Sequence, residues 1–189
     1  MNAAITDDSA TLDGKELSEE LGSLMRALGE KAASCESCTA GAVADAISWA
    51  PGASAWFEAG LVCYSESAKT ALAGVDPELF AGPGVVSSEV ALSMASGAAK
   101  ASGSRFGVAT TGLAGPGGSR SPRGAELPCG LVCFAAVDEV SGACKLKSEV
   151  FAGSREEVRR AAARRAMQLL IELARVAKPR GQRAVSSEA

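Results

Sequence analysis

The spacing of hydrophobic positions changes several times along the chain, and each change predicts a different element. Five apolar residues recur at helical spacing before Gly29: Leu17, Leu21, Leu24, Met25 and Leu28. A short apolar segment at 31–35 predicts a strand, and an Ala-rich stretch after the turn at 36–41 predicts a helix that ends near residue 50, before Pro51-Gly52. The chain therefore begins with alternating helix and strand.

The same alternation continues to the end of the chain. We expect a strand at 56–64, a helix at 65–72, a helix from Ser87 or Ser88 to about residue 101 and a strand at 105–111. Strands at 130–137 and 144–151 flank Ser141-Gly142, which favours a hairpin. The last helix begins after Ser154 and has one apolar face: Val158, Ala162, Ala166, Leu169, Leu170 and Leu173. Interleaved helices and strands predict an α/β sandwich with a mixed sheet.

Length, composition and charge indicate how many domains the chain forms and which partners it lacks. The 189 residues suffice for one domain, which we place at 14–177, with flexible tails at 1–13 and 178–189. Aromatic residues make up only 4% while Gly and Ala are plentiful, so elements should pack closely through small side chains. A net charge of −3 offers no basic field for nucleic acid, and no apolar run approaches the ~20 residues of a membrane span. With no signal-like start, we expect a soluble, cytoplasmic protein without nucleic-acid or membrane partners.

The chain contains no histidine. Ser-His-Asp and Cys-His catalysis and His-ligated zinc are therefore excluded within it, and proton transfer in an enzyme of this sequence must use Lys, Tyr or carboxylates. The six cysteines are interpreted as small core residues, since cytosolic thiols stay reduced. Cys35 and Cys38 form a C-x-x-C motif, which leaves a dithiol redox role or zinc as alternatives. The spacing of Cys129 and Cys133 is unsuited to the second pair of ligands that a zinc site would need.

Three segments could carry chemistry. Ser37 and Thr39 follow a short strand just before a helix, where free amides favour an anion or an oxyanion; the alternative is a simple helix cap. Tyr64, the only tyrosine, ends a strand, and Lys69 lies about one helical turn after Ser65. A desolvated lysine, or a tyrosine beside one, could activate a serine nucleophile; the alternative is an ordinary surface lysine.

The third segment is the glycine-rich run within 110–119, which lies in a long irregular stretch at 112–130. Glycines allow backbone amides to form a concavity for phosphate, although the run is neither a Walker A loop nor a dinucleotide fingerprint; a flexible connector is the alternative. Arg155 and Arg159, four residues apart on the last helix, could reach a phosphate together, or could belong to a solvated face.

These segments together resemble one family, the C-terminal domain of the competence/damage-inducible CinA proteins, which includes stand-alone nicotinamide mononucleotide deamidases. Seven motifs occur in the family's order over about residues 16–175: CESCTAG at 35–41, PGAS at 51–54, VCYSESAK at 62–69, GVVS at 84–87, TGLAGPGG at 111–118, PCGLV at 128–132 and GSREEVR at 153–159. Several independent motifs in one order make the resemblance specific.

The resemblance implies a three-layer α/β/α sandwich that hydrolyses the carboxamide of nicotinamide mononucleotide to nicotinic acid mononucleotide and ammonia, without a metal or cofactor. It implies Ser37 as nucleophile, activated by Tyr64 and Lys69. It also implies a small-molecule pyridine mononucleotide as the substrate, and a homodimer or higher homo-oligomer. The expected substrate-binding residues are Thr39, Ala40, Gly41, Thr111, Gly112, Gly115, Gly117, Gly118, Arg155 and Arg159.

The sequence departs from the family pattern at three places. Ala40 replaces a glycine, Glu66-Ser67 replaces Asn-Glu, and Leu127 stands where a lysine often precedes Pro128. Arginines at 120 and 123 could supply the missing cation. The departures leave open a second function, a catalytically weak or inactive nucleotide-binding or partner-binding module of the same fold.

Overall fold

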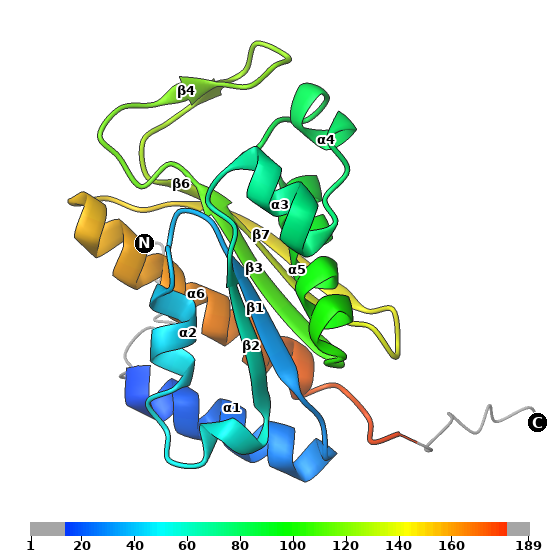
Figure 1. Ribbon diagram of the computed structural model, residues 1–189. Helices are drawn as coiled ribbons and strands as arrows, with labels where there is room; N and C mark the ends of the chain where they lie inside the picture. Colours follow the sequence, from blue (N-terminus) through cyan, green and yellow to red (C-terminus); the bar gives the residue numbers. More distant parts are fainter. Residues whose placement is uncertain (1–13, 181–189) are drawn as a thin grey trace, which may run out of the picture.

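Five strands form a mixed sheet at the centre of the computed structural model, which describes residues 14–180 (Figure 1). In the order in which they lie, the strands are β2 (Phe57–Val62), β1 (Ala32–Glu36), β3 (Phe106–Gly112), β6 (Leu131–Asp138) and β7 (Cys144–Val150). β1 pairs in parallel with β2 and β3, whereas β6 is antiparallel to both β3 and β7. The predicted mixed sheet and its C-terminal hairpin are confirmed.

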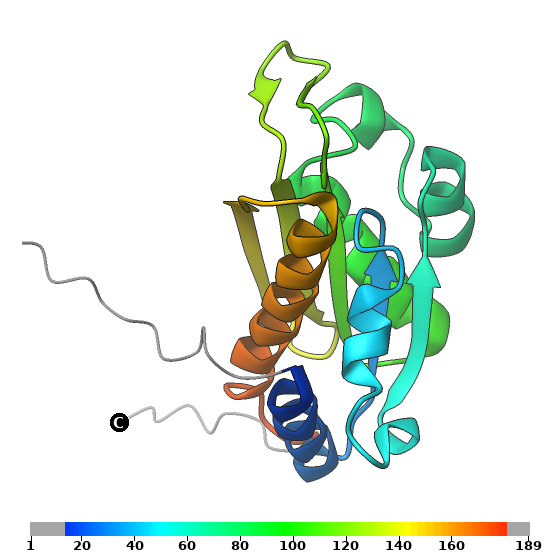
Figure 2. The same cartoon turned by 90° about the vertical axis from the view of Figure 1, so that its left-hand side faces the viewer.

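Helices cover both faces of this sheet (Figures 1 and 2). One face carries α1 (Gly14–Leu28), α2 (Ala42–Ile47) and α6 (Arg155–Ala174), and the other carries α3 (Glu66–Ala73), α4 (Glu78–Ala81) and α5 (Ser88–Ser102). Two separate hydrophobic clusters fill the spaces between the layers, because successive strand residues point to opposite faces. The three-layer α/β/α sandwich is therefore confirmed.

Small residues allow the layers to approach closely. A Cβ atom added at Gly97 of α5 would lie 1.8 Å from the carbonyl oxygen of Ala73 at the end of α3. A Cβ atom added at Gly107 of β3 would lie 2.1 Å from the carbonyl oxygen of Ala95 in α5. Both distances are far shorter than a van der Waals contact, so only glycine fits, as the Gly-rich composition predicted.

Several local features differ from the sequence prediction. α2 ends at Ile47, a 3₁₀ turn follows at Ala53–Ala55, and the short α4 was not predicted. Within the stretch predicted as irregular, β4 (Ser119–Arg120) and β5 (Glu126–Leu127) form a small antiparallel hairpin. None of the described helices is long and apolar enough to cross a membrane.

The end of the described chain also contacts the domain. The carbonyl of Lys178 accepts a hydrogen bond of 2.9 Å from Arg105, and Arg180 forms an ion pair with Glu30. Contacts thus continue at least three residues past the boundary predicted at 177. The tail predicted at 1–13, and residues 181–189 of the tail predicted at 178–189, lie outside the described residues.

Candidate active site

A cavity of about 440 Å³ lies beyond the carboxyl ends of the parallel strands β1, β2 and β3. Open α/β sheets bind ligands at this edge, because the loops after parallel strands converge there. Here the loops follow Glu36, Val62 and Gly112, and the start of α6 adds one side chain, Arg155. The three segments singled out in the sequence therefore meet in space.

Ser37 and Lys69 form a buried pair at the base of this cavity. Lys69 is fully buried in α3, and its Nζ donates to Ser37 Oγ at 2.9 Å, to the Cys63 carbonyl at 3.0 Å and to the Tyr64 carbonyl at 3.3 Å. Burial lowers the pKa of Lys69 because the charged ammonium loses its hydration. The alternative of a surface lysine is wrong, and the ammonium is aimed at the predicted nucleophile.

The phenol of Tyr64 points elsewhere. Its side chain is 59% exposed, and its Oη accepts a hydrogen bond of 2.9 Å from Arg155 Nη2. Arg155 Nη1 donates in turn to the carbonyl of Gly115 at 2.9 Å. The structure therefore brings Ser37 and Lys69 together and places the Tyr64 hydroxyl with Arg155 and the glycine-rich loop at the mouth of the cavity.

Glu36 organises the turn that carries Ser37. This carboxylate is fully buried at the end of β1 and accepts hydrogen bonds from the amides of Gly41, Val43 and Ala44 at 2.8–3.0 Å. The amides at the start of α2 are thus occupied by Glu36, and the residue that caps the helix is Gly41, without a side-chain hydrogen bond. The alternative in which Ser37 or Thr39 caps the helix is wrong. Glu36 was missed in the sequence; the available signal was a carboxylate ending an apolar strand.

Two amides next to the nucleophile have no partner among the described residues, and of the two residues only Cys38 lines the cavity, because Thr39 is fully buried. Neither Cys38 N nor Thr39 N donates to another residue within 14–180, whereas the Ser37 amide donates to the Thr110 carbonyl at 2.9 Å. A free amide that follows a serine and lines a cavity, as that of Cys38 does, can hold an oxyanion. The Thr39 side chain faces inward instead, where its Oγ1 contacts Glu36 at 2.8 Å and Thr110 Oγ1 at 2.7 Å.

The expected substrate-binding residues divide into two groups. Those that line the cavity are Thr111, Gly112, Gly115, Gly117, Gly118 and Arg155. Those that build or brace the turn behind it are Thr39, Ala40, Gly41 and Arg159. Arg159 donates to the Thr39 carbonyl at 2.8 and 3.2 Å, so it and Arg155 do not converge on one point as the sequence suggested.

The glycine-rich loop forms one wall of the cavity. Gly115 and Gly117 have φ values of 98° and 92°, which side-chain-bearing residues rarely adopt, so glycine is needed at both positions. At the start of the loop, Thr111 Oγ1 donates to the Val85 carbonyl at 2.8 Å and ties the loop to the segment before α5. The wall is therefore backbone held in a defined conformation, suited to hydrogen bonding with a polar ligand.

The C-x-x-C cysteines lie on different sides of the sheet. Cys35 belongs to the cluster beneath α5, and Cys38 belongs to the cluster beneath α1, α2 and α6. Burial raises the pKa of both thiols, that of Cys38 to about 11, which disfavours the reactive thiolate. Within residues 14–180 no three Cys, Asp or Glu side chains are grouped to hold a metal ion.

Comparison with known proteins places the chain in a family. Residues 14–174 match the sequence model of the CinA C-terminal domain. The chain belongs to the CinA C-terminal domain family. It is 41% identical over 155 residues to the nicotinamide-nucleotide amidohydrolase PncC of Escherichia coli K12, an alignment covering 82% of this chain and 91% of PncC. It is 45% identical over 147 residues to a CinA-like protein of Geotalea uraniireducens, covering 78% of this chain but only 34% of that longer relative.

Solved structures of the CinA family share the fold. The competence damage-inducible protein A of Klebsiella pneumoniae superposes with a TM-score of 0.80 at 30% sequence identity, covering 88% of this chain and all of that one. The competence/damage inducible protein CihA of Agrobacterium tumefaciens gives 0.78 at 36% identity, covering 86% and 96% of the two chains.

The departures from the CinA pattern lie away from the Ser37–Lys69 contact. Ala40 is exposed, with a left-handed φ of 49°, and does not line the cavity. Glu66 and Ser67 are exposed on the first turn of α3, and Leu127 lies in the β4–β5 hairpin. Arg120 pairs with Glu126 on that hairpin at 3.1 Å. Neither Arg120 nor Arg123 lines the cavity, so the missing cation is not replaced there.

Proposed function

We propose that the protein is a nicotinamide-nucleotide amidohydrolase that uses Ser37 as nucleophile and Lys69 as general base. The observation that carries the proposal is the 2.9 Å hydrogen-bond contact between the buried Lys69 Nζ and Ser37 Oγ. In a chain without histidine, a desolvated lysine is a group whose lowered pKa suits it to accept the serine proton. The PncC relatives, named for this activity, supply the substrate class.

Each step of the reaction has a group to perform it. Neutral Lys69 takes the proton of Ser37 while Oγ attacks the carboxamide carbon, and the amide of Cys38 holds the oxyanion that forms. The resulting ammonium of Lys69 protonates the leaving nitrogen, so the C–N bond breaks and ammonia departs. Water, deprotonated by Lys69, then attacks the ester formed with Ser37. As the ester C–O bond breaks, Lys69 returns the proton to Ser37 Oγ, and nicotinic acid mononucleotide is released.

Arg155 and the glycine-rich loop are suited to hold the phosphate of the substrate. Arg155 is a cation that lines the cavity, and its two contacts, the Gly115 carbonyl and Tyr64 Oη, could be exchanged for phosphate oxygens. The role predicted for Tyr64 as an activator stays a prediction. Its position beside Arg155 favours a role in binding, and Tyr64→Phe distinguishes the two through kcat and KM.

The test is ammonia release from nicotinamide mononucleotide, compared with nicotinamide and with the dinucleotide. Ser37→Ala and Lys69→Met should each reduce kcat by about 10³-fold or more, as removal of one member of a catalytic unit does. The matched control is Lys100→Met, which alters an exposed lysine of α5. Wild-type turnover in Lys69→Met would contradict the mechanism. Calorimetric binding of the mononucleotide without turnover by the wild-type chain would favour the binding module instead.

A further inference from the structure

Two basic side chains are buried in the described part of the chain, and they differ in what surrounds them. Arg105 is neutralised by two carboxylates, those of Asp138 at 2.7 Å and Glu30 at 3.3 Å. Lys69 forms no ion pair with any described residue, and its Nζ contacts only Ser37 Oγ and two backbone carbonyls. A buried charge is costly unless it has a partner of opposite sign. When Lys69 is protonated, its ammonium therefore lacks the kind of counter-ion that Arg105 has.

The groups whose charges act on Lys69 do not supply that counter-ion. They are the thiols of Cys35, Cys38 and Cys63 and the carboxylate of Glu66. Burial raises the pKa of the Cys35 thiol, and that of the Cys38 thiol to about 11, so neither is an anion near neutral pH. Glu66 is exposed and acts on Lys69 only through its charge, without a hydrogen bond. None of the atoms that Lys69 Nζ contacts is an anion.

The active-site cavity as a whole is positively charged. Lys69 lies at its base and Arg155 at its mouth, and none of the described residues that line it is Asp or Glu. Arg155 contacts the Gly115 carbonyl and the Tyr64 hydroxyl, so it also has no carboxylate partner in the described chain. A ligand with an anionic group at each end would match this arrangement of charges.

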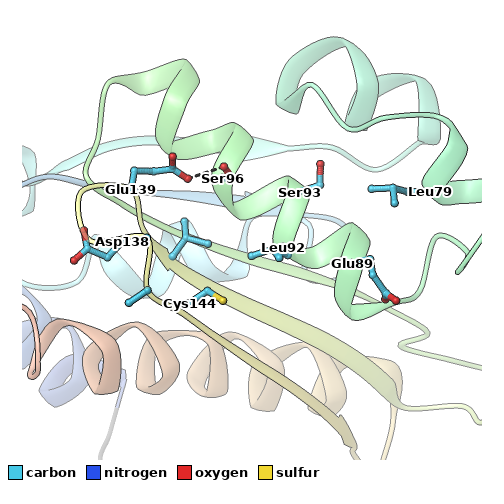
Figure 3. Close-up of a pocket in the computed structure, with 11 residues that line it drawn as sticks. Leu79, Glu89, Leu92, Ser93, Ser96, Asp138, Glu139 and Cys144 are labelled. Carbon is cyan, nitrogen blue, oxygen red and sulfur yellow. Dashed lines mark hydrogen bonds between the residues drawn. The ribbon is translucent and has the colours of Figure 1, made fainter.

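A second hollow has the opposite charge. It has a volume of about 460 Å³ and lies between α5 and the β6–β7 hairpin (Figure 3). Its lining includes Glu89, Asp138 and Glu139 but no lysine or arginine. This hollow offers no partner to an anionic nucleotide, so the charge pattern favours the active-site cavity as the place where such a nucleotide binds.

We infer that nicotinic acid mononucleotide, the product of the proposed reaction, binds more tightly than the substrate and inhibits the protein. The inference rests on the proposed function, because that reaction leaves the new carboxylate beside Ser37 Oγ, which lies 2.9 Å from Lys69 Nζ. Substrate and product share the ring, the ribose and the phosphate and differ only at this group. The carboxylate supplies the counter-ion that the ammonium lacks, whereas the neutral carboxamide does not.

Product binding is linked to the protonation of Lys69. Burial lowers the pKa of Lys69, and a carboxylate beside it raises that pKa again, because the pair favours the charged amine. Below the lowered pKa the free protein already holds the ammonium. Above it, product binding must take up a proton, so the preference for the product falls as the pH rises. Since catalysis needs the neutral amine, bound product also holds Lys69 in the form that cannot act as a base.

Calorimetry on Ser37→Ala, which lacks the nucleophile but retains Lys69, separates affinity from turnover. At the low end of the pH range over which wild-type kcat/KM rises, the product should bind about 10–100-fold more tightly than the substrate, as a hydrogen-bonded charge pair does. At the high end this ratio should fall, and titrations in two buffers of different ionisation enthalpy should show proton uptake on product binding. Equal affinities throughout, or a ratio that does not change with pH, overturn the inference.

Lys69→Met, added to Ser37→Ala, identifies the group responsible. Methionine has nearly the length of lysine without its charge, so the variant should bind the two nucleotides with equal affinity. Lys100→Met, at an exposed lysine of α5, is the matched control and should keep the preference for the product. A preference that survives Lys69→Met overturns the inference. The pH dependence of the Ser37→Ala protein tests it even if Lys69→Met does not fold.

The outcomes also separate this inference from the proposed function. If the wild type releases ammonia from nicotinamide mononucleotide and the product is not preferred, the inference alone fails. If neither nucleotide binds and no ammonia is released, the proposed function fails with it. When both hold, added product should inhibit the wild type in competition with the substrate, and more strongly at lower pH.

Discussion

Replacing Glu36 by glutamine should weaken both the fold and the active site, because Glu36 is the carboxylate on which the Ser37 turn is built. Its Oε2 accepts from Thr39 Oγ1 and Gly41 N at 2.8 Å and from Val43 N at 3.0 Å, and its Oε1 accepts from Ala44 N at 2.8 Å. Glutamine has the same shape but only one accepting oxygen. Whichever way the amide is turned, its NH₂ group faces at least one buried donor.

The expected loss in the free energy of unfolding can be worked out from these hydrogen bonds. In the better orientation the carbonyl oxygen keeps the three donors near Oε2, and Ala44 N loses its acceptor, at about 1–3 kcal/mol for an unsatisfied buried group. Loss of a negative charge at the start of α2 costs up to ~2 kcal/mol more. The free energy of unfolding should therefore fall by about 1–5 kcal/mol, and Tm by about 2–20 °C for a chain of this length.

Urea unfolding and steady-state kinetics check the prediction together. The turn sets the position of Ser37 relative to Lys69 and the free amides, so kcat should fall more than KM rises. Glu19→Gln, which alters an exposed ion pair of α1, is the control and should change stability by less than about 0.5 kcal/mol. A Glu36→Gln variant with wild-type stability and kcat would refute the reasoning.

Three further predictions concern single charged groups. Burial lowers the pKa of Lys69 below 10.5, so kcat/KM should rise with pH as Lys69 loses its proton. The free energy of unfolding should also rise with pH, from the lowered pKa of Lys69 up to pH 10.5. Lys69→Met should abolish the first trend in a pH–rate profile and the second in urea unfolding. Arg155→Ala should raise KM for nicotinamide mononucleotide by about 10–100-fold, whereas Arg160→Ala, which alters an exposed pair with Glu156 on the same helix, should not. Burial opposes ionisation of Asp138, but Arg105, at 2.7 Å on both oxygens, outweighs it and lowers the pKa of Asp138 to about 2. Asp138→Asn should cost about 3–5 kcal/mol at pH 7 in urea unfolding, because it leaves the charge of Arg105 without its partner. The wild type should lose only the part that comes from the lowered pKa, about 2.5 kcal/mol, as the pH falls from 3.8 towards 2.

The sequence predicts most elements of this fold because they are long enough to show a hydrophobic period. The apolar face of α6 and the alternation of long strands and helices are confirmed by the sheet and its two helical layers. α4 and the β4–β5 hairpin were missed for the same physical reason. Four helical residues and pairs of two-residue strands contain too few positions for a period to be recognised.

Within the site, the sequence indicates which residues are present but not where their side chains point. Tyr64 and Lys69 are close in sequence, but their side chains lie apart. Successive residues of an extended chain face opposite ways, so the side chain of Cys63 is buried and that of Tyr64 is 59% exposed. Lys69 therefore meets the carbonyl of Tyr64 and not its phenol. The burial of Lys69 depends on how α3 packs against the sheet and α5, which no local pattern specifies.

The three departures from the CinA pattern can now be weighed by position. A loss of activity would require a change at the Ser37–Lys69 contact, at the free amide of Cys38 or at the lining of the cavity. Ala40 lies outside that lining and is exposed, although its left-handed backbone conformation costs an L-residue about 1–2 kcal/mol. Leu127 also lies outside it and removes a cation without obstructing the nucleophile. Glu66 and Ser67 are exposed outside that lining, and the charge of Glu66 raises the pKa of Lys69 against the larger effect of burial. The departures therefore bear on backbone strain, on the pKa of Lys69 and on affinity for phosphate, and none of them removes the Ser37–Lys69 contact that supports the proposed activity.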